Sequence, residues 1–291
     1  MTGVGGKRVV ITGATGGIGL AAATRLAALG AELTIVARTQ ERAAGAVADI
    51  KAAAGSNSVV DVLIADLASQ AAVRRLADEV LQRYPRVDVL VNNAGAIYST
   101  RRMTADGIEL TWAVNHLAPF LLTTLLLDRL TASAPARVIT TSSGAHQSAH
   151  IPFDDLSAER RYTALGYARY GETKLANILF TAELARRLEG TRVTATCFHP
   201  GFVDTGFNTN NGGFMRVAMT IGHLFARRPE KGAETLVWLA DSPEAGRTNG
   251  GYFMDKHLVT PSAAARDTES ARRLWQVSEE QTRERAGATG A

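Results

Sequence analysis

The sequence contains few of the residues that mark secreted or non-globular proteins. Of its 291 residues, one is cysteine, 8 are proline and 27 are glycine. The single Cys197 has no partner for an intrachain disulfide, so a reducing compartment, the cytoplasm, is expected. The glycine and proline contents are too low for collagen or for low-complexity disorder.

Long apolar runs and clustered charges are also missing. The longest apolar stretch, residues 117–127, holds 11 residues, which is too short to span a bilayer. The first residues, MTGVGGKRVVITG, lack the apolar core and cleavage site of a secretory signal. The 32 basic and 28 acidic residues are dispersed, as on a solvated surface and unlike a nucleic-acid footprint. We therefore expect a soluble protein with a small-molecule partner, without nucleic acid and without a membrane span.

The chain alternates short β-branched runs with longer helical patterns. Strands are predicted at residues 8–12, 33–37, 59–64, 87–91, 137–141, 193–198 and 251–254. Helices are predicted at residues 18–29, 40–54, 69–84, 107–130, 167–188 and 229–240. This alternation favours an α/β fold, a doubly wound (Rossmann) parallel sheet of about seven strands with helices on both faces. No linker interrupts it, so residues 1–291 are interpreted as one domain, with a polar tail from about residue 279.

A glycine-rich turn follows the first strand, in VVITGATGGIG. Gly13, Gly17 and Gly19 have the spacing GxxxGxG where the chain enters a helix. Without Cβ atoms they let the backbone approach a pyrophosphate, whose charge meets the helix N-terminus. Taken alone, the pattern is also compatible with an ordinary tight turn.

The end of the second strand indicates which dinucleotide fits. A carboxylate there would bind the ribose hydroxyl of NAD, but the sequence is VARTQ, which places Arg38 and Thr39 at the tip. A guanidinium grips a 2′-phosphate bidentately, so the hypothesis is NADP. The alternative is an ordinary surface arginine.

Three polar clusters follow successive predicted strands. NNAG, residues 92–95, follows the strand predicted at 87–91, and Ser142 and Ser143 follow the strand predicted at 137–141. In YGETK, Tyr170 and Lys174 lie four residues apart, on one face of a helix. A nearby ammonium lowers the pKa of a phenol and suits it to proton transfer.

Taken in order, these motifs resemble the short-chain dehydrogenase/reductase family. They are TGATGGIG, NNAG, Ser143 with YGETK, and HPG at residues 199–201, and the similarity covers residues 7–277. FDDLSAER, KLANILFTAELARRL and ARRLWQVSEE further resemble the retinol-dehydrogenase-like and bacterial carbonyl reductase subgroup. Two departures are Gly16, where NADPH-using members often have a basic residue, and Ala118–Pro119 in NHLAPF.

The resemblance implies roles for individual residues. Tyr170 is implied as general acid/base, Lys174 as its tuning partner and ribose ligand, Ser143 as the group that polarises the carbonyl, and Asn115 as part of a proton relay. Asp66 is implied to lie beside the adenine and Asn93 to line the cofactor cleft. The expected cofactor-binding residues are Gly13, Thr15, Gly17, Ile18, Gly19, Arg38, Asp66, Leu67, Asn93, Ala94, Gly95, Tyr170, Lys174, Pro200, Gly201 and Val203. Relatives associate through the helix that bears Tyr170, so a homo-oligomer is left open.

The resulting expectation is an NADP-dependent oxidoreductase that moves a hydride between the nicotinamide and an apolar aldehyde or ketone. The alternatives are a nucleotide-sugar epimerase or dehydratase, and a non-catalytic NADP(H)-sensing regulatory protein. Residues 202–228 are interpreted as a substrate lid, since they carry an apolar helical face after a glycine- and asparagine-rich hinge. A packed surface helix and a membrane-surface helix are the other interpretations.

Several remaining residues are interpreted as structural. Cys197 is expected to be a core hydrophobe, and Trp112, Trp238 and Trp275 are expected to pack between helices. His146 and His150 are placed near the substrate but lack the further ligands of a zinc site, so no metal is expected.

Overall fold

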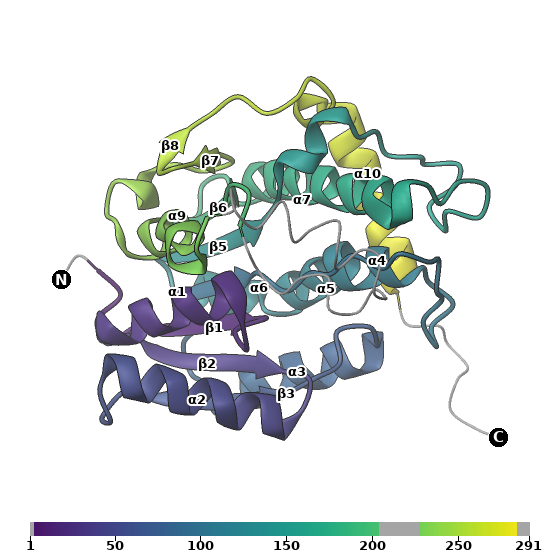
Figure 1. Cartoon of the computed structure of the whole chain (residues 1–291). Helices are drawn as coiled ribbons and strands as arrows, with labels where there is room; N and C mark the ends of the chain where they lie inside the picture. Colours follow the sequence, from purple (N-terminus) through teal and green to yellow (C-terminus); the bar gives the residue numbers. More distant parts are fainter. Residues whose placement is uncertain (1–2, 204–226, 284–291) are drawn as a thin grey trace.

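The computed structural model describes residues 3–203 and 227–283. These residues form one eight-stranded sheet in the order β3-β2-β1-β4-β5-β6-β7-β8 (Figure 1). The strands are β1 (Arg8–Thr12), β2 (Glu32–Ala37), β3 (Val60–Ile64), β4 (Val89–Asn92), β5 (Ala136–Thr141), β6 (Val193–His199), β7 (Tyr252–Met254) and β8 (His257–Leu258). The pairs from β3 to β7 are all parallel, so the predicted doubly wound α/β fold is confirmed.

The eighth strand corrects the expected count of about seven. Strand β8 pairs antiparallel with β7, with Phe253 opposite Leu258. The two residues between them, Asp255 and Lys256, have φ angles of 50° and 66°, as in a tight hairpin turn. A two-residue strand has no alternation that sequence periodicity could reveal.

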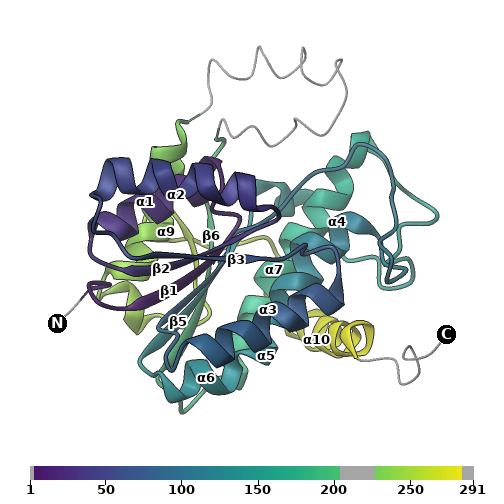
Figure 2. The same ribbon diagram turned by 90° about the horizontal axis from the view of Figure 1, so that it is seen from below.

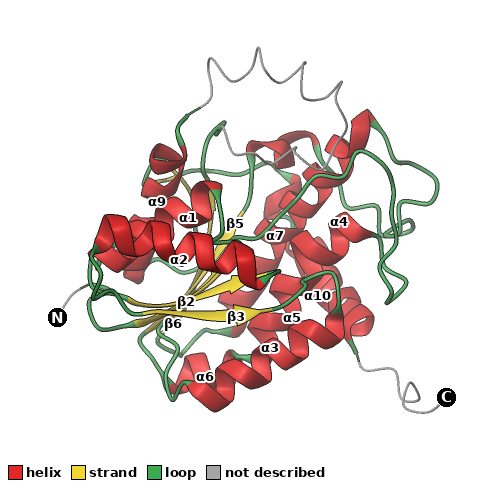
Figure 3. Ribbon diagram, turned by 60° about the horizontal axis from the view of Figure 1, so that its bottom comes forward, coloured by secondary structure: helices red, strands yellow, loops and turns green. Residues whose placement is uncertain are grey.

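Helices cover both faces of the sheet, as Figures 2 and 3 show. One layer consists of α1 (Gly17–Ala28), α2 (Gln40–Ala54) and α9 (Pro229–Asp241). The other contains α3 (Gln70–Arg83), α5 (Ala118–Leu125), α6 (Leu127–Ala132) and α7 (Tyr167–Arg187). Each layer has its own buried apolar cluster, because the parallel strands are apolar on both sides. Among the described residues, no helix is both long and apolar enough to cross a membrane.

The predicted helix at 107–130 is interrupted. The chain forms α4 (Leu110–Trp112), a π-helical turn η1 (Ala113–Leu117) and then α5. The wide turn contains Asn115, whose side chain is fully buried. A π turn depends on i→i+5 hydrogen bonds and tertiary contacts, which an apolar pattern does not reveal.

A further helix, α10 (Thr268–Thr282), follows the sheet and runs past residue 279, where the sequence predicted a tail. Asp267 caps it by accepting hydrogen bonds from the amides of Glu269 and Ser270. The helix packs on α7 and η1, and in Figure 1 it is the yellow helix behind α7. Its Trp275 ring lies 5.0 Å from Phe120 in α5, so this segment belongs to the folded body.

Most of the predicted substrate lid lies outside the described residues, which include only its ends, 202–203 and 227–228. These ends meet: Val203 forms a bridge with Arg227, whose amide donates to the Phe202 carbonyl at 2.7 Å. Arg227 also forms an ion pair with Asp255 of the hairpin turn. The two ends of the segment are therefore held against the sheet at one place.

Candidate active site

The site lies where the parallel strands end. Gly13 follows β1, Asn93 follows β4, Ser143 comes two residues after β5, and Pro200 follows β6. Because the strands are parallel, these residues come to one edge of the sheet, where ligands of open α/β sheets bind.

The glycine-rich turn has the shape that a pyrophosphate site needs. Gly13 and Gly17 have φ angles of 69° and 52°, which glycine adopts without strain. A Cβ atom on Gly19 would lie 2.2 Å from the Gly13 carbonyl oxygen and 2.5 Å from Nδ2 of Asn93. Helix α1 begins after Gly16, and no side chain caps it. Its first-turn amides are therefore available to an anion, and these residues fit a dinucleotide phosphate.

Hydrogen bonds fix the NNAG turn to the end of β1. The Thr12 hydroxyl accepts from the amides of Asn93 and Ala94, both at 3.1 Å. The Asn93 side-chain amide donates to the carbonyls of Thr12 at 3.1 Å and Gly13 at 3.2 Å. Thr12 was not among the residues predicted from the sequence. Its signal was a hydroxyl at the last position of a buried strand.

Arg38 and Asp66 are exposed at the ends of β2 and β3. Burial raises the pKa of Tyr98, and the charges of Arg38 and Asp66 act on it in opposite directions, so both lie near this ring. Glu32 lies at the opposite end of β2 and pairs with Arg8 at 2.7 Å. The tip of β2 thus presents a cation and no carboxylate from its own strand.

The remaining predicted cofactor residues surround these turns. Ile18 and Val203 lie side by side against α9, since a Cβ atom on Gly232 would contact both. Thr15 and Leu67 are partly buried in the turns after β1 and β3, and Pro200 is partly buried after β6. Gly201 has a φ angle of 84° and lies beneath the Arg227 side chain.

Asn115 joins the end of the NNAG turn to α7, since its Nδ2 also donates to the Thr173 hydroxyl at 3.1 Å. Its Oδ1 accepts from the Ala96 amide at 2.8 Å, and its Nδ2 donates to the Ala96 carbonyl at 2.9 Å. A Cβ atom on Gly95 would lie 3.3 Å from Nζ of Lys174 and 3.4 Å from Oδ1 of Asn115. A glycine here lets the turn, η1 and α7 meet at the lysine.

The two serines after β5 have different roles. The Ser142 hydroxyl is buried and donates to the Lys174 carbonyl at 2.8 Å. The Ser143 side chain forms a hydrogen bond with the phenol of Tyr170. Ser143 is therefore the serine that contacts the Tyr170 phenol, and its catalytic role stays a prediction. Tyr167, the other tyrosine nearby, is exposed.

Burial shifts the pKa values of both ionisable groups on α7. It raises the pKa of Tyr170, and the hydrogen bond from Ser143 only partly opposes this effect. It lowers the pKa of Lys174 to about 8. The Lys174 ammonium donates to the Thr141 carbonyl at 3.1 Å and lies 5.3 Å from the centre of the Tyr170 ring. The net direction for the phenol is opposite to the lowering that the sequence predicted, because desolvation outweighs its neighbours.

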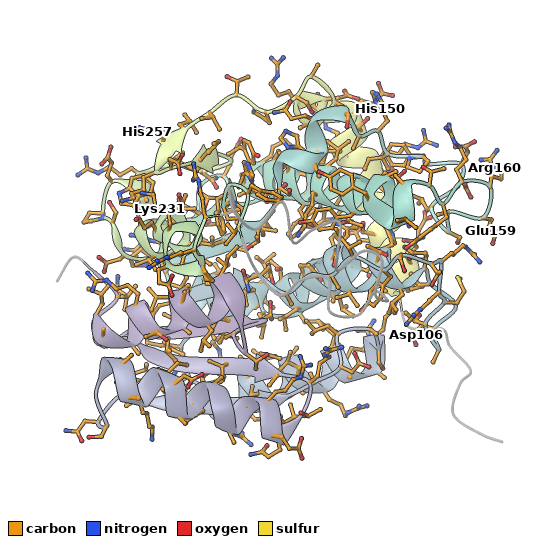
Figure 4. The ribbon with its side chains drawn as sticks, in the orientation of Figure 1. Asp106, His150, Glu159, Arg160, Lys231 and His257 are labelled. Atoms are coloured by element: carbon orange, nitrogen blue, oxygen red, sulfur yellow. The ribbon has the colours of Figure 1, made fainter. Side chains whose placement is uncertain are left out.

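Two histidines, the buried His146 and the half-buried His199, hold the backbone around Ser143. Nδ1 of His199 accepts from the amides of Gly144 at 3.2 Å and Gly201 at 3.3 Å, and burial lowers the pKa of this ring to about 4. Nδ1 of His146 lies 2.7 Å from the Ser143 carbonyl oxygen. His150 lies at the surface (Figure 4). In residues 3–203 and 227–283, no cluster of His, Cys, Asp and Glu could hold a metal ion.

The residues expected to be structural are packed inside the fold. Cys197 is 1% exposed, and burial raises the pKa of its thiol to about 12, so it is a core residue and not a nucleophile. Trp112 and Trp275 are buried, and Trp238 packs 5.6 Å from the ring of Phe253.

Comparison with known proteins agrees with this geometry. The model of the short chain dehydrogenase family matches residues 7–214. The chain belongs to this family. Human retinol dehydrogenase 14 is 41% identical, over 94% of this chain and 85% of that protein. A Streptomyces protein named "Putative daunorubicin C-13 ketoreductase DnrU" is also 41% identical, over 95% of this chain and 92% of its own length.

A solved structure supports the fold of this short-chain dehydrogenase. The crystal structure of a short-chain dehydrogenase from Burkholderia cenocepacia in complex with NADP is 28% identical, with a TM-score of 0.68, and covers 91% of this chain and 99% of that one. The chain is thus an oxidoreductase of the retinol-dehydrogenase-like group, with a small-molecule substrate.

Proposed function

We propose that the protein is an NADPH-dependent reductase of apolar aldehydes or ketones. The observation that carries this proposal is the meeting of Ser143, Tyr170 and Lys174 beside the glycine-rich turn. The one sheet that runs through the described residues supports our proposal that residues 1–291 form a single oxidoreductase domain. The single cysteine supports a cytoplasmic location.

The preference for NADPH rests on Arg38. This side chain is exposed at the tip of β2, where a 2′-phosphate would be bound by a guanidinium and repelled by a carboxylate. Gly13, Gly17, Gly19 and the first turn of α1 would hold the pyrophosphate. When bound, the nicotinamide supplies the hydride. The NADP in the Burkholderia relative is consistent with this choice.

The chain's own residues handle the substrate oxygen and the proton. Ser143 and Tyr170 donate hydrogen bonds to the carbonyl oxygen as negative charge develops on it. Tyr170 then gives up its phenolic proton. Its raised pKa keeps it protonated at neutral pH, as a proton donor must be. Lys174 provides an ammonium next to the phenol, and Asn115 fixes the turn that faces both groups.

The proposed substrate class rests on an exposed apolar residue beside the site and on the names of two relatives. Phe202, at the entrance to the predicted lid, is 57% exposed. The names of two relatives refer to retinol and to a ketone. We therefore propose an apolar carbonyl substrate, with residues 202–228 as its lid.

The test is oxidation of NADPH and NADH against apolar aldehydes, aromatic ketones and quinones. We expect turnover with NADPH that falls by about 10²–10⁴-fold in Tyr170→Phe, the range for loss of a general acid. Tyr167→Phe is the matched control, since that exposed ring lies 6.2 Å away on the same helix, and it should retain wild-type turnover. Unchanged turnover in Tyr170→Phe would exclude the assigned mechanism, and tight NADPH binding without any turnover would favour a regulatory protein.

A further inference from the structure

A buried chain of polar side chains runs from α10 to the catalytic lysine. Ser278 Oγ in α10 lies 2.9 Å from Nε2 of His116 in η1. Nδ1 of His116 lies 3.4 Å from Oδ1 of Asn177 in α7. The Asn177 side-chain amide donates to the Thr141 carbonyl at 3.2 Å. The same carbonyl accepts the hydrogen bond from Lys174 at 3.1 Å.

The hydrogen bonds between Thr141, Asn177 and His116 have one consistent direction. The Thr141 oxygen requires a donor, so Asn177 turns its NH₂ group toward it and its Oδ1 toward His116. Oδ1 in turn requires a proton on Nδ1 of His116. Burial lowers the pKa of His116 to about 3, so the ring is neutral and Nε2 is an acceptor for the Ser278 hydroxyl. The single proton of that hydroxyl is shared between Nε2 and the Leu274 carbonyl, which lies 2.7 Å away.

Asn177 and Lys174 therefore share one acceptor. A carbonyl oxygen has two lone pairs, and the Asn177 amide, whose Oδ1 lies 3.4 Å from His116, occupies one side. This leaves the ammonium a single place at the other side. Asn177 is one turn after Lys174 on the same helix, so it is the residue that contacts the same oxygen from the C-terminal side.

We propose that Asn177, held in place by His116 and Ser278, is a positioning residue for Lys174, and that α10 thereby supports the catalytic lysine. This proposal rests on the proposed function only where it predicts that a displaced Lys174 lowers the rate of carbonyl reduction. In this proposal α10 helps to position Lys174, although the helix itself contacts neither substrate nor cofactor.

The surroundings of the chain argue against a role in packing alone. The His116 ring lies 4.7 Å from Trp112 and 6.4 Å from both Phe120 and Phe180. An apolar ring would fill this space without the cost of burying polar groups. The charge of Arg169 lowers the pKa of His116, and Cys197 is the titratable group that acts on the pKa of Lys174. The Tyr170 ring lies beside the Lys174 ammonium.

Nuclear magnetic resonance of lysine tests the proposal without any substrate. The sequence has five lysines, so protein labelled with ¹³C at lysine Cε gives five signals, and Lys174→Arg identifies one of them. We expect His116→Phe, which keeps a ring at this site, and Asn177→Leu each to shift the titration midpoint of Lys174 by about half a pH unit or more, well below the effect of full burial. Thr282→Val is the matched control. It removes another buried hydroxyl that bonds within α10, and it should leave the signal unchanged.

Kinetics then separates positioning from folding. His116→Phe and Asn177→Leu should lower kcat several-fold and shift its pH profile, with KM for the carbonyl unchanged. A purely structural role would lower the melting temperature and leave the pH profile as in wild type. A Lys174 signal that titrates as in wild type in both variants would overturn the proposal. If the signal shifts but the wild-type protein reduces no carbonyl, the link to α10 holds and the proposed function fails.

Discussion

The two halves of the site are held by different kinds of contact. The dinucleotide half, comprising residues 13–19 and 93–95, is held by close backbone approaches and by hydrogen bonds to Thr12. The catalytic half, comprising Ser143, Tyr170 and Lys174, is held by buried side chains from η1, α7 and α10. The dinucleotide half requires glycines without Cβ atoms, whereas the catalytic half requires specific polar side chains at hydrogen-bonding distance.

This difference predicts two kinds of response to mutation. An added methyl group at Gly13 or Gly19 meets backbone atoms at less than 3 Å, so its effect is close to all or none. A change in the catalytic half moves a side chain by a fraction of an ångström, so its effect is graded.

The largest expected effect is that of Gly19→Ala. Its Cβ atom would overlap the Gly13 carbonyl oxygen, so the turn must open and NADPH binding, measured by fluorescence titration, should be lost. Gly45→Ala in α2 is the control, because no atom lies within 4 Å of the added carbon and alanine favours a helix by about 0.5–1 kcal/mol. NADPH binding by Gly19→Ala at wild-type affinity would contradict the steric account.

The next effect is a loss of stability in the catalytic half. Arg169, next to Tyr170, pairs with Glu109 at 2.8 Å, and both side chains are at most 1% exposed. Arg169→Met leaves a buried carboxylate unpaired and should lower the free energy of unfolding by about 3–5 kcal/mol, measured by urea denaturation.

The exposed pair Arg160–Asp154 provides the comparison for Arg169→Met. Both side chains are more than half exposed, and Figure 4 shows Arg160 on a loop at the edge of the molecule. Arg160→Met should change the free energy of unfolding by about 1 kcal/mol or less. Equal decreases in the free energy of unfolding in the two variants would show that burial of the Arg169–Glu109 pair does not increase its contribution to stability.

A smaller effect is expected at the tip of β2. Arg38→Gln should reduce the ratio of NADPH to NADH affinity by about 10- to 100-fold, the value of a hydrogen bond to a charged group. Arg25→Gln, another exposed arginine in the last turn of α1, should leave the ratio unchanged. Calorimetric titration of each variant with both cofactors gives the ratio, and an unchanged ratio in Arg38→Gln would remove the basis for NADP preference.

The last effect is a pH dependence of stability at Lys174. Burial lowers its pKa from 10.5 to about 8, so between these values the unfolded chain binds more protons than the folded chain. The stability contributed by this site therefore rises with pH across this window, by at most roughly 1.4 kcal/mol per pH unit. Lys174→Met should be more stable than wild type at pH 7, and this advantage should shrink from pH 8 to 10 in denaturant titrations. A difference that stays constant with pH would exclude the shifted pKa.

Local sequence signals located the strand, the glycine-rich turn and the helix of the dinucleotide half. Strand β1 has the predicted bounds, and Gly13 and Gly17 of the following turn have positive φ angles, as suits a tight turn. This success is understandable, because a strand, a turn and a helix N-terminus are built from neighbouring residues.

The catalytic half depends on contacts that no local pattern records. The π turn at Asn115 accompanies hydrogen bonds to Ala96, and the raised pKa of Tyr170 results from burial by distant elements. Helix α10 did leave a signal, since Ala271, Leu274, Trp275 and Ser278 follow helical spacing and are buried. Only its last residues, from Glu279 onward, were predicted to be a polar tail.

Helix α10 also has a consequence for synthesis of the protein. Ser278 and Gln281 bond to His116 and Trp112, residues that leave the ribosome more than 160 positions earlier. The nascent chain can form the β1–α1 turn early, but η1 and Lys174 obtain their full support only after residue 281 has emerged. A ribosome stalled before this point should therefore display a chain with a nearly complete dinucleotide half and an unfinished catalytic half.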